Sequence, residues 1–523
     1  MTWEPELEEL RRREALAAAM GGEESVSRQR ARGKLTVRER IALLVDEGTW
    51  RETGMIAGRG AYGDDGTLDN LTPTNFVVGQ GRVEGRPVVV QGDDFTVRGG
   101  AADASIWEKF VWPEKAANEL RLPLVRLVDG TGGGGSVKSL TDMGFSYVPP
   151  LPGGDLWVDN LAKVPVVAAA LGPCAGLGAA RVVMAHFSVI VKEIGQLFVA
   201  GPPVVAWAMN EELDKETLGG ARMQTKAGAV DNEAADEEDA IAQLKRFLSY
   251  LPENVWEPPP IVASTDPAGR REEELLGIVP RDPRKTFKIR HVVELVFDHG
   301  SFFELGARFG GSLVTGLARL EGRPVGVLAS DSRHYGGSLT GDASDKLARF
   351  VDLCDQFHLP VVNLVDQPGF LVGRESEQAG TLRRGSRALF AVNQATVPWC
   401  SILLRKVYGI AGAAHGNGAR LNLRYAWPSG NWGSLPIAGG LEAAFKRQLE
   451  EAEGVGGRER LRAEIEARLT AVLSPFRTAE HFSIEHIIDP RDTRSVLCAW
   501  AERAHTLVRY ELAAGPKARG PRP

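Results

Sequence analysis

Two glycine-rich turns occupy equivalent places in this chain of 523 residues, each between an apolar segment and a helix-forming segment. The first covers residues 172–178 (GPCAGLG) and the second residues 405–412 (RKVYGIAG). A turn of this kind leaves the first N–H groups of the following helix unpaired, and the helix dipole adds partial positive charge there. Such N–H groups can hold an oxyanion, although glycines also permit tight packing of a strand on a helix.

Side chains that could act as catalysts are scarce around these turns. The sequence contains no GxSxG elbow, no HExxH motif and no phosphate-binding P-loop. His415 follows the second turn, but a lone loop histidine more often has a structural role. Asp129 and Asp366 end equivalent strands, where capping or loop fixing is favoured over acid–base work. Arg405 and Lys406 stand at the mouth of the second turn, where they either hold an anionic group or are solvated.

The segments around the two turns occur twice. Residues 82–88 (RVEGRPV) match residues 319–325 (RLEGRPV), and matches at the same offset continue to Asp129 and Asp366. A slightly shorter offset aligns the two glycine-rich turns. The first copy contains a hairpin, a helix, a strand buried on both faces and a second strand that ends in the turn. The sequence therefore predicts an α/β protein with two similar domains rather than a repeat array.

Composition predicts the domain boundaries. Residues 1–255 are expected to form the first domain, and residues 256–285, rich in proline and charge with little periodicity, a linker. Residues 286–515 are expected to form the second domain, and residues 516–523 a disordered tail.

Bulk properties restrict the class of protein. A hydrophobic share of 43% with 25% charged residues is typical of a soluble globular chain, and a net charge of −6 gives no indication of nucleic-acid or anionic-membrane binding. No apolar run of about 18 residues suggests a membrane span. The four cysteines have neither zinc-site nor disulfide spacing, so we expect reduced, mostly buried thiols in a cytoplasmic protein without a metal site.

Several motifs resemble those of one enzyme family, in collinear order. They are GKLTVRERI at 33–41, GPCAG at 172–176, VDQPGFLVG at 365–373, RKVYG at 405–409, AWP at 426–428 and IDPRDTR at 488–494. The chain is thereby similar to the carboxyltransferase, or β, subunit of biotin-dependent acyl-CoA carboxylases, the propionyl-CoA and methylcrotonoyl-CoA carboxylase group. The resemblance covers nearly the whole sequence. It implies two tandem crotonase-like domains of the ClpP/crotonase superfamily, related by internal duplication.

The resemblance also implies a reaction. In that family an acyl-CoA thioester binds mainly through the N-terminal domain and carboxybiotin through the C-terminal domain. CO2 moves to the alpha, or vinylogous, carbon of the acyl group through an enolate; one oxyanion hole holds this enolate and the other the biotin ureido oxygen. Such chemistry needs preorganised N–H groups and exclusion of water more than a side-chain base. A separate biotin carboxylase and biotin carrier (alpha) subunit is implied, with a homo-hexameric core that is a dimer of trimers.

Site residues follow from the resemblance by position. The thioester oxyanion hole falls at Gly176 and Leu177, and the biotin oxyanion hole at Ile410 and Ala411. Relatives usually carry Gly-Gly and Gly-Ala there, with a Tyr-Asp pair after the second hole that this chain lacks, so the acyl group is not fixed by the sequence. The residues expected to line the substrate sites are Gly132, Gly133, Ala175, Gly178, Arg405, Lys406, Tyr408, Gly409, Gly412 and Ala413.

Other activities stay open beside the carboxylase. The same half-reaction could run backwards, as in biotin-dependent acyl-CoA decarboxylases. A crotonase-type acyl-CoA enzyme independent of biotin, such as a thioester decarboxylase or hydrolase, is a second class. The third is a catalytically weak scaffold subunit, which the bulky Leu177 and Ile410 suggest.

Overall fold

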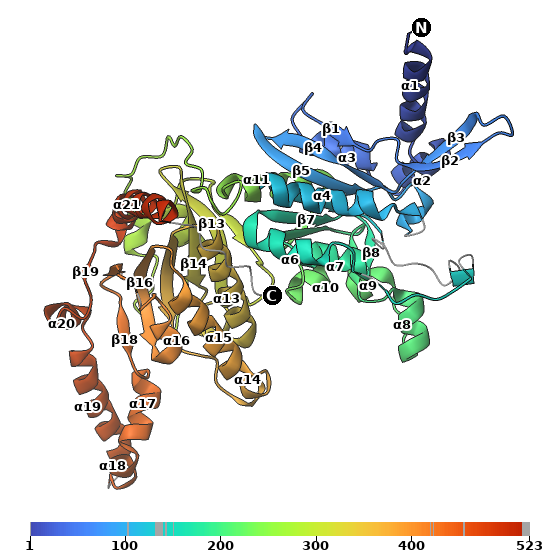
Figure 1. Ribbon diagram of the computed structural model, residues 1–523. Helices are drawn as coiled ribbons and strands as arrows, with labels where there is room; N and C mark the ends of the chain where they lie inside the picture. The colour runs from blue at the N-terminus through green and yellow to red at the C-terminus, as the bar shows by residue number, and fades with distance from the viewer. Residues whose placement is uncertain are drawn as a thin grey trace. The chain divides into compact units, whose positions relative to one another are not determined.

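The computed structural model describes residues 2–101, 104–130, 140–141, 144–149, 151–418, 420–421, 423–452 and 456–514. The chain divides after Glu257 into two compact units. Both units are built from helices and mixed sheets, so the predicted α/β class is confirmed (Figure 1). The predicted tail at residues 516–523 lies outside the described residues.

The first unit contains α1 (Glu4–Ala18), α2 (Glu23–Ala31), α3 (Val37–Leu44), β1 (Arg51–Thr53), β2 (Gly58–Tyr62), β3 (Leu68–Pro73), β4 (Phe76–Val83), β5 (Arg86–Asp93), η1 (Arg98–Gly100), α4 (Trp107–Leu120), β6 (Leu124–Val128), α6 (Gly154–Lys163), β7 (Val166–Ala170), β8 (Pro173–Ala175), α7 (Leu177–Val183), β9 (Phe187–Val191), β10 (Gln196–Phe198), α8 (Pro202–Met209), α9 (Lys215–Gly219), α10 (Ala221–Lys226), β11 (Asn232–Ala234) and α11 (Glu237–Tyr250).

The second unit contains η3 (Glu273–Leu276), α12 (Ile289–Val296), β12 (Phe303–Leu305), β13 (Leu313–Leu320), β14 (Arg323–Ser330), η4 (Tyr335–Gly337), α13 (Gly341–Gln356), β15 (Val361–Gln367), α14 (Arg374–Gln378), α15 (Thr381–Gln394), β16 (Trp399–Tyr408), α16 (Gly409–Ala413), β17 (Leu423–Ala426), β18 (Asn431–Gly433), α17 (Ile437–Ala444), α18 (Lys446–Glu450), α19 (Gly457–Val472), α20 (Pro475–Glu480), β19 (His486–Ile487), η5 (Pro490–Asp492) and α21 (Thr493–Ala513).

The main sheets of the two units follow the same plan. The seven-stranded sheet of the first unit has the order β1-β4-β5-β6-β7-β9-β11. The eight-stranded sheet of the second has the order β12-β13-β14-β15-β16-β17-β19, with β18 paired to β16. In each sheet the first two pairings of this order are antiparallel and the later ones are parallel.

The hairpin of each sheet is held by an aspartate that follows a helix. Glu84 and Gly85, which join β4 to β5, have φ of 51° and 80°, as a tight two-residue hairpin turn requires. Their N–H groups donate to the carboxylate of Asp46, after α3, at 3.0 and 2.7 Å. Asp298, after α12, accepts the equivalent two bonds in the second unit at 3.0 and 2.8 Å. One device thus fixes helix to hairpin in both units.

Helices cover both faces of each main sheet (Figure 1). On β5, the amide of Gln91 donates to the carbonyl of Phe110 in α4 at 2.9 Å, whereas the next residue, Gly92, lies against Val37 of α3. In the second unit α13 covers one face of β14, and α12 with α21 covers the other. The strands β6, β7 and β9 are buried along their whole length, as expected for parallel strands covered on both sides.

Residues 258–285, which include most of the predicted linker, belong to the second unit and hydrogen-bond to the rest of it. The N–H of Val262 donates to the carbonyl of Gly322 at 3.1 Å. The guanidinium of Arg270 donates to two carbonyls at the end of α12, at 2.8 and 2.9 Å. Arg494, in α21, donates back to the carbonyl of Pro267 at 2.8 Å. These bonds fix the segment along the second unit.

The four cysteines are free and buried, as predicted. Burial raises the pKa of the Cys174 thiol to about 12, so this sulfur stays protonated at neutral pH. Among the described helices, none is both long enough and apolar enough to cross a bilayer.

Candidate active site

The first glycine-rich turn leads from β7 through the short strand β8 into α7. Gly176 has φ +55° and ψ −118°, a conformation that residues with a side chain rarely adopt, and the helix begins at Leu177. The N–H of Gly176 donates to the carbonyl of Phe198 at 3.2 Å, and the N–H of Ala180 donates to the Gly176 oxygen at 2.9 Å. Within the described part of the chain, nothing accepts a hydrogen bond from the N–H groups of Leu177 and Gly178.

The second turn repeats this geometry between β16 and α16. Its glycine, Gly409, has φ +62°, close to the +55° of Gly176. The N–H groups of Ile410 and Ala411 donate to none of the residues that the structure describes. Each unit therefore presents two adjacent N–H donors at the start of a helix.

The predicted donor pair of the first turn shifts by one residue. The family resemblance predicts this pair at Gly176 and Leu177, but the Gly176 N–H is used where β8 pairs with β10. The available donors are Leu177 and Gly178, at the positions that Ile410 and Ala411 occupy in the second turn. The sequence contained this signal, because the offset that aligns the two turns pairs each opening glycine with a glycine.

The side chains beside these donors point into different surroundings. Leu177 is half-buried and packs against the apolar cluster of Phe76, Phe110 and Trp157. Ile410 is 66% exposed. A side chain does not alter the N–H that its residue supplies, so both turns keep their donors despite the bulky residues.

A buried aspartate, Asp129, follows β6, the strand beside β7 in the main sheet of the first unit. The carboxylate of Asp129 accepts hydrogen bonds from Lys34 at 2.7 Å and from Arg40 at 2.8 Å, and Arg40 also pairs with Glu237 at 2.6 Å. Burial lowers the pKa of Lys34. A Cβ on Gly172, in the turn, would lie 1.9 Å from an Asp129 oxygen, so only glycine fits there. The aspartate is engaged in fixing the turn, the role that the sequence favoured over acid–base work.

Arg405 makes the corresponding contact in the second unit. Its Nε and Nη2 lie 3.1 and 2.7 Å from the carboxylate of Asp366. Asp366 lies near the end of β15 and is the residue of the second copy that matches Asp129. Its Nη1 donates to the carbonyl of Lys285 at 2.8 Å. The predicted contact of Arg405 with an anionic ligand is therefore replaced by a buried ion pair. Lys406 is half-buried, and burial lowers its pKa.

Tyr408 and Gly412 frame the second turn. The Tyr408 hydroxyl donates to the side-chain oxygen of Asn431, and burial raises its pKa. A Cβ on Gly412 would lie 2.9 Å from the carbonyl carbon of Val407, so the helix can start close to the strand only with glycine there.

The remaining predicted site residues differ in burial and position. Ala175 is half-buried in β8, and Ala413 is exposed at the end of α16. Gly132 and Gly133 lie outside the described residues. His415 has its Nδ1 2.8 Å from a backbone carbonyl of the second turn, and burial lowers its pKa, which fits a structural role.

Two further turns reach the same strand ends, a feature that was missed from the sequence. η1 and η4 each hold two glycines with positive φ. A Cβ on Gly100 would lie 3.0 Å from the carbonyl oxygen of Asp129, and one on Gly337 would lie 2.6 Å from that of Asp366. The signal was present in the sequence, because Gly99-Gly100 and Gly336-Gly337 match at the offset that relates Asp129 to Asp366, and such close backbone approach requires glycine.

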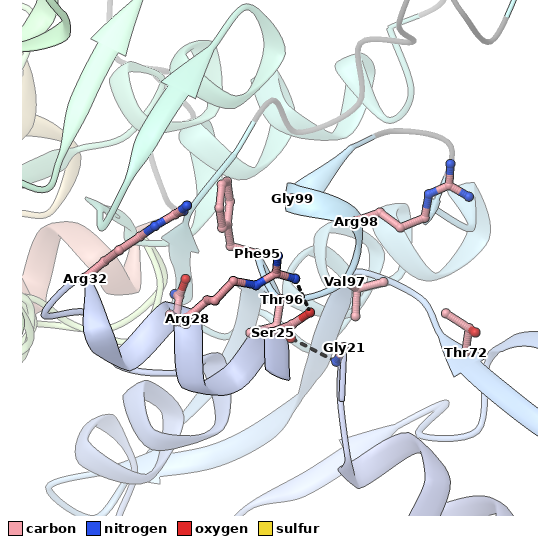
Figure 2. A pocket seen from close by; sticks show the side chains of 11 residues that line it. Gly21, Ser25, Arg28, Arg32, Thr72, Phe95, Thr96, Val97, Arg98 and Gly99 are labelled. Carbon is pink, nitrogen blue, oxygen red and sulfur yellow. Dashed lines mark hydrogen bonds between the residues drawn. The ribbon is translucent and has the colours of Figure 1, made fainter. Parts of the chain in front are cut away.

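A cavity of about 430 Å³ opens beside η1, between α2 and residues 95–99 (Figure 2). Three arginines contribute to its wall, Arg28, Arg32 and Arg98, and none of the described residues that line it is acidic. Arg28 extends from α2 toward the loop and donates to Ser25 at 3.2 Å (Figure 2). This charge pattern favours an anionic ligand.

The fold and the two turns define an α/β protein of two like-built units, in each of which a glycine-rich turn presents adjacent backbone N–H groups at the start of a helix. Residues 28–513 match the carboxyl transferase domain family. The chain therefore belongs to this carboxyltransferase family, and the resemblance found in its sequence is confirmed.

Relatives match over nearly the whole length. The chain is 34% identical over 506 residues to the carboxyltransferase subunit of propionyl-CoA carboxylase from Haloferax mediterranei, covering 95% of this chain and 96% of that one. It is 31% identical over 500 residues to the alpha subunit of methylmalonyl-CoA decarboxylase from Veillonella parvula, covering 94% of each. A solved structure of transcarboxylase 12S, a hexamer assembly with methylmalonyl-CoA and methylmalonic acid bound, has a TM-score of 0.85 at 32% identity, covering 97% and 96%.

Proposed function

We propose that this chain is the carboxyltransferase subunit of a biotin-dependent acyl-CoA carboxylase, built from two crotonase-like domains that arose by duplication. One observation carries the proposal. Each unit presents two adjacent N–H groups without an acceptor among the described residues, at the same point of the same topology. Leu177 and Gly178 would hold the oxygen of a thioester enolate, and Ile410 and Ala411 the ureido oxygen of biotin.

When bound, carboxybiotin would supply the CO2 that bonds to the α-carbon of the thioester, and its ureido nitrogen would take the proton that this carbon loses. The tasks left to the chain are to orient the thioester, to stabilise its developing negative charge and to keep water out. The N–H groups of Leu177 and Gly178 meet the second task without a proton transfer. Asp129 and Asp366 are not needed as bases, which agrees with their burial in ion pairs.

The cavity with Arg28, Arg32 and Arg98 supports coenzyme A as the carrier of the acyl group. Phosphates are dianionic or monoanionic groups that guanidinium side chains bind well. Gly99 lines this cavity, and the next residue, Gly100, lies against the backbone of Asp129, whose carboxylate lies against Gly172 at the start of the first glycine-rich turn. A CoA phosphate held by the arginines would thus leave its thioester arm directed along the first unit toward Leu177.

Partners follow from the same proposal. A separate biotin carboxylase and biotin carrier subunit would deliver carboxybiotin to the second unit. A homo-hexameric core is supported by the hexamer assembly of transcarboxylase 12S.

The purified full chain tests the proposal without its partner. It would be incubated with 2-carboxyacyl-CoA thioesters and biocytin, and the acyl-CoA produced would be measured by mass spectrometry. We expect loss of the carboxyl group that depends on biocytin. Arg28→Gln should raise KM for the thioester about tenfold, because it removes one phosphate contact. Arg30→Gln, on the same helix but outside the cavity, should leave KM unchanged.

The outcome separates the alternatives. Decarboxylation that proceeds equally without biocytin would replace this proposal with a biotin-independent crotonase-type enzyme. Absence of any reaction with a broad thioester panel would favour a scaffold subunit.

A second candidate is the same half-reaction run as a decarboxylase, which the match to the Veillonella parvula decarboxylase subunit favours. The direction is set by the partner. Gentle isolation of the native complex, followed by detection of biotinylated chains with streptavidin, would yield either an ATP-dependent biotin carboxylase or a membrane decarboxylase.

A further inference from the structure

An apolar pocket of about 350 Å³ lies next to the donor turn of the first unit. Its walls come from the end of β10, from helix α8 and from α9 and α10. The described residues that form these walls include no charged side chain. The one polar residue among them, Gln224, donates its amide to the carbonyl of Leu197 at 2.9 Å. The pocket therefore offers apolar surface and little hydrogen bonding to a ligand.

The position of the pocket follows from strand pairing. β10 runs parallel to β8, with Leu197 opposite Cys174 and Phe198 opposite Ala175. The carbonyl of Phe198 accepts the N–H of Gly176 at 3.2 Å. Leu197 and Phe198 both line the pocket, so its wall is bonded directly to the residue that precedes the donors.

Helix α8 presents apolar residues that the described residues of its own unit leave unburied. Its sequence is PPVVAWAM, and none of its residues is buried. Val204 and Met209 line the pocket and are 55% and 71% exposed. Exposed apolar surface that surrounds a hollow indicates a ligand site. The face of the same helix that carries Trp207 lies outside the pocket lining.

We propose that this pocket receives an apolar acyl chain of the thioester substrate, several methylene groups longer than propionyl. The inference rests on the proposed function, and names the substrate class that the first donor turn serves. A thioester whose oxygen lies on the N–H groups of Leu177 and Gly178 would extend its acyl chain along Phe198 and into the pocket. A volume of about 350 Å³ is within the range of small-molecule sites, and far exceeds the need of a propionyl group.

Binding to a homologous series of thioesters tests the inference. Acetyl-, butyryl-, hexanoyl- and octanoyl-CoA would be titrated into the full chain by isothermal calorimetry, with free CoA as reference. We expect the dissociation constant to fall roughly fourfold with each added methylene until the pocket is filled. A constant affinity across the series would overturn the inference while leaving the proposed function intact. No binding of CoA or of any thioester would overturn both.

Two variants of α8 sharpen the test. Ala208→Phe fills the pocket from its wall, so octanoyl-CoA should bind at least tenfold more weakly while acetyl-CoA binds as before. Trp207→Ala, on the same helix outside the pocket, should change neither value. If the chain-length dependence survives Ala208→Phe and vanishes in Trp207→Ala together with a smaller assembly in light scattering, the helix is a contact between subunits and the inference is wrong.

Discussion

The two donor turns have the same backbone path but are held in place by different residues. In the first unit, Asp129 is paired with Lys34 and Arg40, which come from the N-terminal segment, and Arg40 is shared with Glu237 of α11. In the second unit, the equivalent aspartate is paired with an arginine of β16, the strand that leads into the turn. The first turn thus depends on distant segments, and the second on its own sheet.

This difference separates the backbone features that both donor turns share from the side-chain contacts that vary between them. The positions of the N–H groups are set by a strand, a glycine with positive φ and the first turn of a helix. Any arrangement that neutralises the buried aspartate behind the turn can preserve that path. The residue that follows the glycine can likewise pack into the core, as Leu177 does, or remain exposed, as Ile410 does.

Removal of the buried cations should have the largest effect. Arg40→Met leaves Glu237 and part of Asp129 unpaired, and Arg405→Met leaves Asp366 without its guanidinium partner. Each variant should lose about 3–5 kcal/mol of unfolding free energy, because a buried charge loses its counterion. Arg30→Met removes only an exposed pair and should cost less than about 1 kcal/mol. Urea titrations measure the unfolding free energy of all three variants. A loss below about 1 kcal/mol for Arg405→Met would show that the ion pair of the second turn does not hold that turn in place.

Removal of a donor N–H should have the second largest effect, a loss of turnover. Proline is tolerated in the first turn of a helix, where Leu177 is the first residue of α7 and Ile410 the second of α16, so Leu177→Pro and Ile410→Pro delete one donor from each turn. Turnover should fall about 10²–10³-fold in either variant. Gly176→Pro is a poor probe, because a φ of +55° is closed to proline and the Gly176 N–H is already bonded.

The matched controls keep the donors. Leu177→Ala and Ile410→Ala retain both N–H groups and should stay within about threefold of the parent rate. If the alanine variants lose as much activity as the proline variants, the side chains rather than the N–H groups carry the function.

Sequence reasoning located the turns because their signals are local. An apolar run such as that of β6 predicts a strand buried on both faces, and a following glycine-rich segment predicts a turn into a helix. The repeat between residues 82–88 and 319–325 added that the plan occurs twice. These features do not depend on contacts between distant segments.

The partners of individual groups could not be predicted in the same way. The bond from Gly176 to Phe198 depends on the pairing of β8 with β10, two strands of three residues without a periodic pattern. Arg405 looked available for a ligand, and only the fold brings it onto Asp366. The arginine cavity joins α2 to residues 95–99, which no sequence motif connects.

Leu177 and Ile410 are packed to different extents, so truncation of each should lower stability by a different and smaller amount. Leu177→Ala should lower the unfolding free energy by about 1–2 kcal/mol, because it leaves a gap beside Phe110 and Trp157. Ile410→Ala removes an exposed side chain and should change the value by less than about 0.5 kcal/mol. Thermal and urea unfolding of the pair measure the difference. Equal losses would mean that Ile410 is covered in the assembled protein.

The two hairpins differ in the side chain that hydrogen-bonds between hairpin and helix, an arginine in the first unit and a histidine in the second. In the first unit Arg86 donates to the carbonyl of Leu248 at 2.6 Å, and in the second His505 of α21 donates to the carbonyl of Pro324 at 2.9 Å. Burial lowers the pKa of His505 to about 4, and the nearby charges of two arginines act in the same direction. Arginine keeps its charge throughout this range.

The change of unfolding free energy with pH follows from the protons that the folded and unfolded chains bind. Between pH 6.5 and 4 the unfolded chain protonates His505 while the folded chain does not, so the unfolding free energy falls as pH falls through this window. The share of His505 should be on the order of 1 kcal/mol at pH 5.5. His505→Gln keeps a donor for Pro324 but cannot titrate, so its stability should decline less between pH 7 and 5.5 than that of the parent chain. Parallel declines in the two proteins, measured by urea titration at both pH values, would show that the second hairpin is no more sensitive to acid than the first.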